Sequence, residues 1–447
     1  MGRLFGTDGI RGVANRDLTP ELAFSLGRAL AHVLAGNDEK PVITIGKDTR
    51  ISGDMLEAAL AAGICSRGVD VYQLGVVPTP AIAYLTRHLG AQAGAVISAS
   101  HNPMADNGIK FFNQFGSKLS DEVEDEIASF VLEKNEEIPR VEGGRVGRII
   151  LLDQGKKIYM DYLREVFGGS LRGYHIVVDS ANGAASGIMP ELLRSLGAKV
   201  TSLSDEPNGV NINQDCGSTH MENLREHVIQ HGADLGIAHD GDADRMLAVD
   251  DLGRIVDGDR IMAICARYLK SRGELKGNLL VGTVMSNLGL RKFCQAEGIE
   301  FLATQVGDRY VLEEMEKRGA VLGGEQSGHV IFLGYNTTGD GLLSALMLLK
   351  AMKAGKGRLS RMADLMTVYP QILRNVRVKD KEMAMKDPGF EQAVAAAEDL
   401  LKDRGRILVR PSGTEPLVRI MAEGEDTQEI DRIVRGLAKA LEQGGRH

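Results

Sequence analysis

Apolar and polar positions follow one another along most of the chain in a pattern that predicts short buried strands separated by amphipathic helices. Residues 19–36 begin with Thr-Pro and carry leucine, alanine and valine at helical spacing before a glycine, which is typical of a capped helix. An apolar, β-branched run follows at 41–46, and helices and strands then alternate as far as a strand at 93–98. Alternation of this kind predicts βαβ units around a mostly parallel, buried sheet.

The same pattern restarts twice further along the chain, which indicates three related units although no residue repeat accompanies it. Apolar strand-like runs separated by helical stretches lie at 174–179, 198–203, 233–238, 278–283, 299–304 and 320–324. After Tyr369 and Pro370, three strand-like segments and an alanine-rich helix predict a smaller domain of a different kind. The expected fold class is α/β, with three related mixed-sheet α/β domains at 1–153, 154–254 and 255–367 and a smaller C-terminal α+β domain at 368–447.

Composition excludes several classes of protein. The 447 residues carry a net charge of -8, which disfavours nucleic acid and anionic membranes as main partners because both attract basic surfaces. The four cysteines lie far apart with no Cys-x-x-Cys pair, so neither a zinc site nor a disulfide framework is indicated. No apolar leader and no run of about 18 apolar residues occurs. We therefore expect a cytoplasmic protein without a nucleic-acid or membrane partner.

The strongest isolated motif is Asp-Gly-Asp-Ala-Asp-Arg, which directly follows the run at 233–238. Three carboxylates this close repel one another unless a cation is present, and their oxygens favour Mg²⁺ or Ca²⁺. An EF-hand loop opens in the same way, but it needs glycine and glutamate where this chain has arginine and aspartate. The motif therefore predicts either a cation site with a phosphate-binding arginine or a solvated acidic turn, formed by Asp240, Asp242, Asp244 and Arg245.

A second polar loop, Ser-Ala-Ser-His-Asn-Pro, follows the strand at 93–98. Its position places Ser100 at the carboxyl edge of the sheet, where open α/β folds bind ligands. A serine beside a histidine is also common in turns with local hydrogen bonds, and no Gly-x-Ser-x-Gly elbow occurs here. The next segment, Asp106 to Lys110, is expected either to form an ordinary Asn-Gly turn or to bring the lysine toward Ser100.

Three further loops have the composition of phosphate or sugar sites. The N-terminal Gly-Thr-Asp-Gly-Ile-Arg-Gly run combines glycine amides with Arg11, but it matches neither Walker A nor the dinucleotide fingerprint. The run Gly-Gly-Glu-Gln-Ser-Gly-His at 323–329 offers polar groups for sugar hydroxyls. Residues 410–415 combine a guanidinium, two hydroxyls and a glycine amide, and Arg419 follows in the next strand. Each segment alone fits a plain turn, but four loops at strand ends, one in each expected domain, indicate a central cleft.

Together these motifs resemble those of the α-D-phosphohexomutase superfamily. The segments FGTDGIRG, SASHNP, DGDADR, GEQSGH and RPSGTEP occur in that order and span nearly the whole chain. The first segment, the alanine of DGDADR and the glutamine of GEQSGH resemble the phosphoglucosamine mutase branch more than the phosphomannomutase and phosphoglucomutase branches. The resemblance implies four domains in a heart-shaped arrangement around a central cleft.

The resemblance also implies a role for each residue of these segments. Ser100 would be a phosphoserine that passes its phosphoryl group to the sugar and takes another back. The metal ligands would be Ser100, Asp240, Asp242 and Asp244. The groups near the phosphoryl group would be Arg11, His101, Lys110, Arg245 and His329. Sugar hydroxyls would meet Glu325 and Ser327, and the other phosphate would meet Arg410, Ser412, Gly413, Thr414 and Arg419.

The implied reaction interconverts glucosamine 6-phosphate and glucosamine 1-phosphate through a 1,6-bisphosphate, on the route to UDP-N-acetylglucosamine and the cell wall. The cofactors would be Mg²⁺ and a primer, either glucosamine or glucose 1,6-bisphosphate. The implied partners are a sugar phosphate, a second copy bound through the first domain, and an activating kinase unless Ser100 is phosphorylated autocatalytically. The alternatives are phosphomannomutase or phosphoglucomutase activity, a metal-dependent sugar phosphatase, and a non-catalytic sugar-phosphate sensor.

Overall fold

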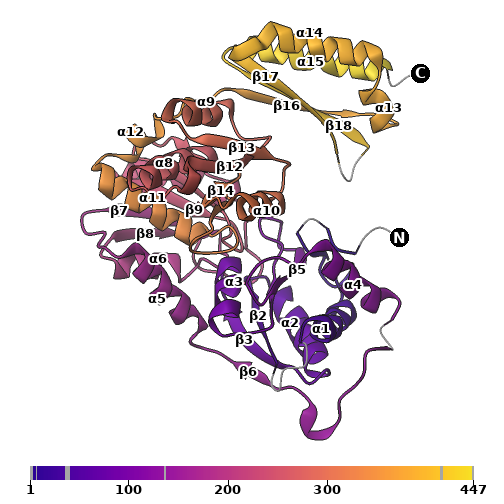
Figure 1. The fold of residues 1–447 in the computed structure, drawn as a ribbon. Helices are drawn as coiled ribbons and strands as arrows, with labels where there is room; N and C mark the ends of the chain where they lie inside the picture. Colours follow the sequence, from indigo (N-terminus) through magenta and orange to yellow (C-terminus); the bar gives the residue numbers. More distant parts are fainter. Residues whose placement is uncertain (1–3, 7, 36–40, 135–136, 413–415, 445–447) are drawn as a thin grey trace.

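The computed structural model describes residues 4–6, 8–35, 41–134, 137–412 and 416–444. Within them four sheets follow one another along the chain, and we call the units built on these sheets domains I to IV. Figure 1 shows the domains arranged in a curve, with the indigo N-terminal domain and the yellow C-terminal domain facing each other on the right of the view. The smaller C-terminal domain is therefore placed to approach domain I.

Domain I is a six-stranded mixed sheet in the order β1-β5-β4-β2-β3-β6. Strands β2, β3, β4 and β6 are parallel, whereas β5 is antiparallel to both of its neighbours. The predicted helix cap is confirmed, because the Thr19 side chain accepts the N–H of Leu22. The elements are β1 (Ile10–Val13), α1 (Pro20–Leu34), β2 (Val42–Lys47), α2 (Ser52–Cys65), β3 (Asp70–Val76), α3 (Thr79–His88), β4 (Ala93–Ile97), β5 (Asp106–Asn113), α4 (Asp121–Leu132) and β6 (Ile149–Leu151).

Of the two alternatives for the segment after the serine loop, the ordinary Asn-Gly turn is wrong. Residues Asp106–Asn113 form the strand β5, which pairs with β1 on one side and β4 on the other. Pairing on both sides satisfies the backbone groups of this segment, and this overrides the local turn preference of Asn107 and Gly108. The same strand makes the sheet mixed rather than mostly parallel. It also places Lys110 opposite Val96 of β4.

Domains II and III repeat the layered design on smaller sheets. Each has a parallel centre and an antiparallel edge, in the orders β11-β10-β9-β7-β8 and β13-β12-β14-β15. Strand β11 lies just beyond residue 254 and still pairs with β10. Domain II contains α5 (Gly155–Phe167), β7 (His175–Asp179), α6 (Met189–Ser195), β8 (Lys199–Leu203), α7 (Glu222–His231), β9 (Leu235–His239), β10 (Met246–Asp250) and β11 (Ile255–Val256). Domain III contains α8 (Gly258–Ser271), β12 (Leu279–Thr283), α9 (Leu288–Glu297), β13 (Glu300–Thr304), α10 (Asp308–Arg318), β14 (Leu322–Gly324), β15 (Val330–Phe332), α11 (Gly341–Gly355) and α12 (Leu359–Ala363).

Domain IV is an antiparallel three-stranded sheet in the order β16-β18-β17, with α14 and α15 on one face (Figure 1). This arrangement confirms the predicted α+β domain. Its elements are β16 (Gln371–Arg377), α13 (Lys381–Met385), α14 (Pro388–Leu401), β17 (Gly405–Pro411), β18 (Leu417–Gly424) and α15 (Thr427–Gly444).

One hydrophobic cluster is shared by domains I to III, beside further clusters within each of them, whereas the cluster of domain IV is confined to that domain. Phe112 of domain I, Tyr159 of domain II and Leu346 of domain III belong to the same buried cluster. The cluster of domain IV draws its members from residues 372–441. Close-packed apolar contacts resist movement of the packed domains against one another. The first three domains therefore form one packed body, to which domain IV is attached separately.

Hydrogen bonds join domain IV to domain III. The guanidinium of Arg406 donates to the carbonyls of Val284, at 2.8 Å, and Ser286, at 2.5 Å. Glu423 pairs with Arg406 at 2.7 Å and accepts the N–H of Leu288 at 2.6 Å. A polar junction of this kind resembles the interfaces across which domains move.

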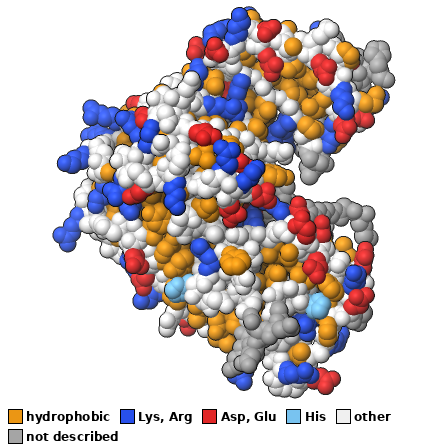
Figure 2. Space-filling view, in the orientation of Figure 1, with side chains coloured by type: hydrophobic (Ala, Val, Ile, Leu, Met, Phe, Trp, Pro, Cys, Tyr) orange, Lys and Arg blue, Asp and Glu red, His pale blue; other side chains and the backbone are white. Residues whose placement is uncertain are grey.

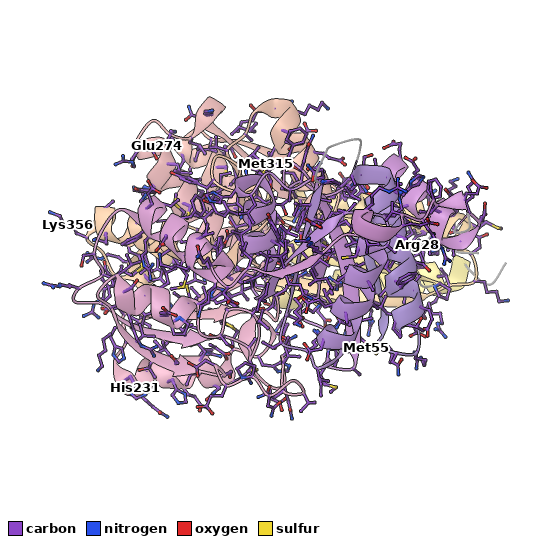
Figure 3. The ribbon with its side chains drawn as sticks, turned by 90° about the horizontal axis from the view of Figure 1, so that it is seen from below. Arg28, Met55, His231, Glu274, Met315 and Lys356 are labelled. Atoms are coloured by element: carbon purple, nitrogen blue, oxygen red, sulfur yellow. The ribbon has the colours of Figure 1, made fainter. Side chains whose placement is uncertain are left out.

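The surface is hollowed between domain IV and domain I on the right of Figure 2. Seen from below in Figure 3, Arg28 and Met55 of domain I lie to the right, whereas His231 of domain II and Glu274 of domain III lie to the left.

Among the described residues, no helix has both the length and the apolar character needed to cross a membrane.

Candidate active site

Three loops meet where domains I, II and III join. The serine loop follows β4, the aspartate loop follows β9 and the turn at 325–329 follows β14, so each lies at the carboxyl end of its strand. Gly241 allows the first two loops to touch, because a Cβ at this position would lie 2.5 Å from the Ser100 carbonyl oxygen. Ser100, Asp240 and Asp242 are each 1% exposed. Charges at this depth need partners or a ligand.

Ser100 is held in a left-handed backbone conformation with its hydroxyl directed at domain II. Its φ is 51°, in a region that non-glycine residues rarely adopt. Such a conformation costs about 1–3 kcal/mol and persists only where the surroundings enforce it. The hydroxyl donates to Asp240 Oδ2 at 2.5 Å. Strain of this kind is typical of functional sites, which supports Ser100 as the reacting residue.

The three aspartates of the loop after β9 form a carboxylate cluster. One oxygen from each of Asp240, Asp242 and Asp244 lies within 4.8 Å of the others. Burial and the two neighbouring carboxylates raise the pKa of Asp240 well above its usual range. The Oδ1 atoms of Asp242 and Asp244 are buried without a hydrogen-bond partner. Because unpaired carboxylate oxygens are the ligands that hard cations prefer, this residue set fits Mg²⁺.

Lys110 provides a positive charge against this cluster. Its Nζ lies 2.9 Å from Asp242 Oδ2, 3.5 Å from Asp8 Oδ2 and 3.7 Å from Asp244 Oδ2. Burial disfavours the charged amine, but Asp242 and Asp8 outweigh burial and raise the pKa of Lys110 above its ordinary value. The lysine is therefore charged at neutral pH, beside the serine loop.

His101 lies beside the serine hydroxyl, Arg245 contacts His101, and Arg11 is near enough to lower the pKa of that histidine. Arg245 Nη1 donates to His101 Nδ1 at 3.2 Å, and that nitrogen is 3.5 Å from Ser100 Oγ. Burial, Arg245 and Arg11 lower the pKa of His101, so its ring is neutral at neutral pH. Arg11 pairs with Asp8, and the Nε atoms of Arg11 and Arg245 are buried without a hydrogen-bond partner, although Arg245 Nε lies 3.9 Å from Asp244 Oδ1. Unpaired guanidinium N–H groups beside a serine favour an anion there.

His329 closes the cluster from domain III. Its Nδ1 lies 3.6 Å from Asp244 and its Nε2 lies 3.5 Å from Asp308. Burial opposes the charged ring, but the two carboxylates outweigh it and raise the pKa of His329 to about 9. The N–H of Gly339 donates to Nε2 at 3.0 Å, which requires an unprotonated Nε2. The raised pKa favours a second proton on Nε2, whereas the Gly339 N–H needs that nitrogen unprotonated. In both cases the ring keeps a proton on Nδ1, facing Asp244.

Glu325 and Ser327 lie on the turn that leads into His329. Glu325 Oε1 accepts the N–H of Gly307 at 3.1 Å, and its carbonyl accepts the N–H of Gly328 at 3.0 Å. The Ser327 side chain is exposed. A partly exposed carboxylate and an exposed hydroxyl on one turn suit the hydroxyl groups of a sugar.

The fourth loop belongs to domain IV. Arg410 and Arg419 are cross-strand partners on β17 and β18, and their Nε atoms are buried without a partner. Burial and the neighbouring Arg419 lower the pKa of Arg410. Two guanidinium groups side by side repel each other and favour an anion between them.

The remaining residues of this loop are only partly described. Ser412 is buried and its N–H donates to the Leu417 carbonyl at 2.9 Å. Gly413 and Thr414 lie outside the described residues. Within the described part of the chain, no hydrogen bond or ion pair joins Arg410 to the cluster around Ser100. The structure therefore brings together three of the four predicted loops.

Several residues of the cluster were not predicted from the sequence. Lys118 Nζ lies 2.6 Å from both Asp8 and Asp308, and so ties domain I to the start of α10 in domain III. Thr79, at the start of α3, donates its hydroxyl to Asp242 Oδ2 at 2.6 Å. Asp8 lies inside the N-terminal glycine-rich motif, so the sequence already marked its segment as a candidate site. Lys118 and Asp308 are single residues in a turn and at a helix start, and no sequence pattern marks them.

Comparison with known families matches all four domains of the chain. The matched models describe phosphoglucomutase/phosphomannomutase α/β/α domain I at residues 2–137, domain II at 157–253, domain III at 257–369 and the C-terminal domain at 373–440. Together these matches cover most of the chain.

Individual relatives match over nearly their full length. The chain is 58% identical to the phosphoglucosamine mutase of Desulforamulus reducens, with 99% of each protein covered. It is 56% identical to that of Carboxydothermus hydrogenoformans, covering 99% of this chain and 100% of the relative. These identities extend through all four domains.

Solved structures show the same fold. A phosphoglucomutase/phosphomannomutase family protein from Burkholderia thailandensis matches with a TM-score of 0.82 at 24% identity, covering 98% of this chain and 97% of that one. The N-acetylphosphoglucosamine mutase of Aspergillus fumigatus, solved in complex with GlcNAc-6P and magnesium, matches with a TM-score of 0.72 at 18% identity, covering 99% and 96%.

Proposed function

The chain belongs to the phosphoglucosamine mutases of the phosphoglucomutase/phosphomannomutase family, and from that premise we propose that it interconverts glucosamine 6-phosphate and glucosamine 1-phosphate. The isomerisation proceeds by phosphoryl transfer through a phosphoserine and a 1,6-bisphosphate sugar. The observation that carries the proposal is the buried, left-handed Ser100, whose hydroxyl meets the aspartate cluster of domain II. The product supplies amino sugar for UDP-N-acetylglucosamine and the cell wall.

Charge neutralisation around Ser100 is the main task of the buried cluster. Phosphoryl transfer needs in-line positioning and compensation of phosphate charge more than covalent assistance. Lys110 supplies a fixed positive charge, and Arg11 and Arg245 each have an Nε–H group without a hydrogen-bond partner in the protein. His101 lies beside Ser100 Oγ and His329 lies beside Asp244, and each ring carries a proton.

The aspartates are suited to hold the metal that this chemistry uses. The proposed ligands are Asp240, Asp242 and Asp244, together with an oxygen of phosphorylated Ser100. Mg²⁺ bound there would neutralise negative charge on the phosphoryl group. In the structure Asp244 lies beside Lys110, His329 and Arg245, which lower its pKa despite its burial, and Asp242 pairs with Lys110.

In this proposal domain III binds the sugar and domain IV binds its second phosphate. Glu325 and Ser327 bind sugar hydroxyls, and the non-transferred phosphate binds Arg410, Ser412, Gly413, Thr414 and Arg419. The 1,6-bisphosphate has to turn around in the cleft, so that each of its two phosphates in turn can bind these domain IV residues. Closure of domain IV over the cleft excludes water, which would otherwise hydrolyse the phosphoserine. A sugar 1,6-bisphosphate primes Ser100, unless a kinase or autophosphorylation does so.

We propose a cytoplasmic homodimer that forms through domain I. Strand β6 is at the edge of the domain I sheet, where its three residues are strongly exposed: Ile149 50%, Ile150 37% and Leu151 64%. An apolar strand with an open hydrogen-bonding edge favours pairing with another strand. We expect Leu151→Lys to lower the dimer fraction in sedimentation velocity. Leu132→Lys, a substitution of another exposed leucine on α4, should leave the fraction unchanged; equal fractions in both variants would exclude β6 as the interface.

Initial rates on three sugar phosphates test the proposed activity. The assay compares glucosamine, glucose and mannose 6-phosphates with Mg²⁺ and a trace of glucose 1,6-bisphosphate. We expect kcat/KM for glucosamine 6-phosphate to exceed the others at least about tenfold, which corresponds to about 1.4 kcal/mol of transition-state discrimination. A preference for glucose or mannose phosphate would overturn the substrate assignment and leave the mutase mechanism intact. Release of more free phosphate than isomerised sugar would instead indicate a phosphatase.

A further inference from the structure

The serine loop between β4 and β5 begins with the buried residues 98–100, whose backbone groups need internal partners. Three of its carbonyl groups, and that of the first residue of β5, accept hydrogen bonds from one side chain, that of Arg50, which follows β2 and whose side chain is 0% exposed. Arg50 Nη2 donates to the carbonyls of Ser100 at 3.0 Å and Asn102 at 2.8 Å. Its Nη1 donates to the carbonyls of Asp106, at 3.0 Å, and Pro103.

Asp48 completes the set and fixes the orientation of the guanidinium. Arg50 Nε donates to Asp48 Oδ2 at 2.9 Å, so all five guanidinium N–H groups have an acceptor. The same Asp48 oxygen accepts the Ser98 hydroxyl at 2.6 Å, and Ser98 Oγ accepts the N–H of Ser100 at 2.9 Å. One buried ion pair therefore holds both the amide and the carbonyl of Ser100.

Domain II holds the same carbonyl from the other side. Asn213 Nδ2 donates to the Ser100 carbonyl at 2.8 Å and to the Asn102 carbonyl at 3.1 Å. Because Asp240 also belongs to domain II, this contact sets the serine loop relative to the aspartate cluster. The left-handed conformation of Ser100 is thus fixed by hydrogen bonds from two domains.

We propose that Arg50, oriented by Asp48, is a positioning residue that sets the direction of the Ser100 hydroxyl for phosphoryl transfer. This inference rests on the proposed function of Ser100. Arg50 is bonded to the loop backbone and to Asp48, and the sugar-reading groups proposed above lie on domains III and IV. Its loss should therefore lower kcat while leaving KM nearly unchanged.

The test compares three variants. Arg50→Lys keeps the positive charge but has three N–H donors on a flexible stem in place of a planar fork with five. Ser98→Ala removes only the hydroxyl that links Asp48 to the Ser100 amide. Arg254→Lys is the matched control, since Arg254 also pairs with a buried aspartate, Asp250, and donates to a backbone carbonyl, but outside the serine loop.

The readout follows Ser100 itself as well as sugar isomerisation. Mixing unphosphorylated protein with glucose 1,6-bisphosphate transfers one phosphoryl group: the Ser100 oxygen bonds to phosphorus, the sugar P–O bond breaks, and the serine proton ends on the released sugar oxygen. Intact-mass measurement over time gives the rate of this half-reaction. It reports on Ser100 whichever sugar phosphate the enzyme prefers.

We expect Arg50→Lys to slow both kcat and the half-reaction by about 100-fold, since a misplacement near 1 Å costs about that much, with KM within about twofold. Ser98→Ala should slow both kcat and the half-reaction by about tenfold. Arg254→Lys should slow neither of them. Rates for Arg50→Lys and Ser98→Ala equal to the control would overturn the inference, as would a loss confined to KM. If Arg50→Lys does not fold, Ser98→Ala decides alone. A wild-type protein that phosphorylates Ser100 but does not isomerise glucosamine 6-phosphate would overturn the proposed function and leave this inference standing.

Discussion

The Ser100→Ala protein is expected to lose isomerase activity by at least about 10⁴-fold, because removal of a nucleophile leaves only binding and charge stabilisation. The substitution removes the oxygen that carries the phosphoryl group in the proposed mechanism. Coupled initial rates with glucosamine 6-phosphate and a primer measure the loss. Intact mass should show that the variant takes up no phosphate from glucose 1,6-bisphosphate.

The fold of the Ser100→Ala protein should survive. The variant loses one hydrogen bond to Asp240, worth about 1–3 kcal/mol when the acceptor is left buried, and circular dichroism should remain native. Ser129→Ala is a suitable control because Ser129 lies on α4 and donates only to a backbone carbonyl within its own helix. Ser100-independent isomerisation, or phosphate uptake by the variant, would contradict the assignment of Ser100.

The second large effect is expected at the metal cluster. Asp242 Oδ2 is occupied by Thr79 and Lys110, whereas Oδ1 is buried without a partner and is the oxygen free for a cation. Asp242→Asn keeps the shape but removes the charge, and it brings N–H groups into a cluster built for a cation. We expect activity to fall at least about 100-fold, the scale of a lost electrostatic stabiliser.

Metal removal should separate this effect from misfolding. Chelation should abolish wild-type activity and Mg²⁺ should restore it. Added Mg²⁺ should also raise the melting temperature of the wild type, because a ligand that binds only the folded state stabilises it, and this rise should vanish in Asp242→Asn. Asp161→Asn, on the exposed face of α5, serves as the control. An undiminished rise in Asp242→Asn would exclude Asp242 as a ligand.

Strand and helix positions were predictable wherever the apolar pattern was strong. The runs at 41–46, 93–98 and 278–283 match β2, β4 and β12 closely, since a strand buried on both faces has to be apolar throughout. Strand β5 was missed because its pairing with β1 and β4 is a long-range property. Short edge strands such as β11 were missed for the same reason.

The candidate site was predictable to the extent that its residues occur in compact motifs. Ser100 and Asp240 each follow an apolar strand directly, so the sequence alone placed both at sheet edges. Arg50 also follows such a strand, but its partners lie about 50 residues further along the chain. No local pattern shows that a guanidinium will meet four backbone carbonyls.

The sequence by itself determined the domain types, the polar loops at strand ends and the chemistry that each loop can perform, because these depend on local spacing and residue type. Only the tertiary structure decided that Lys110 faces Asp242, that Lys118 bridges Asp8 and Asp308, and that domain IV has a separate core. These features depend on packing between segments distant in the chain, where burial removes water and makes each charge dependent on a particular partner.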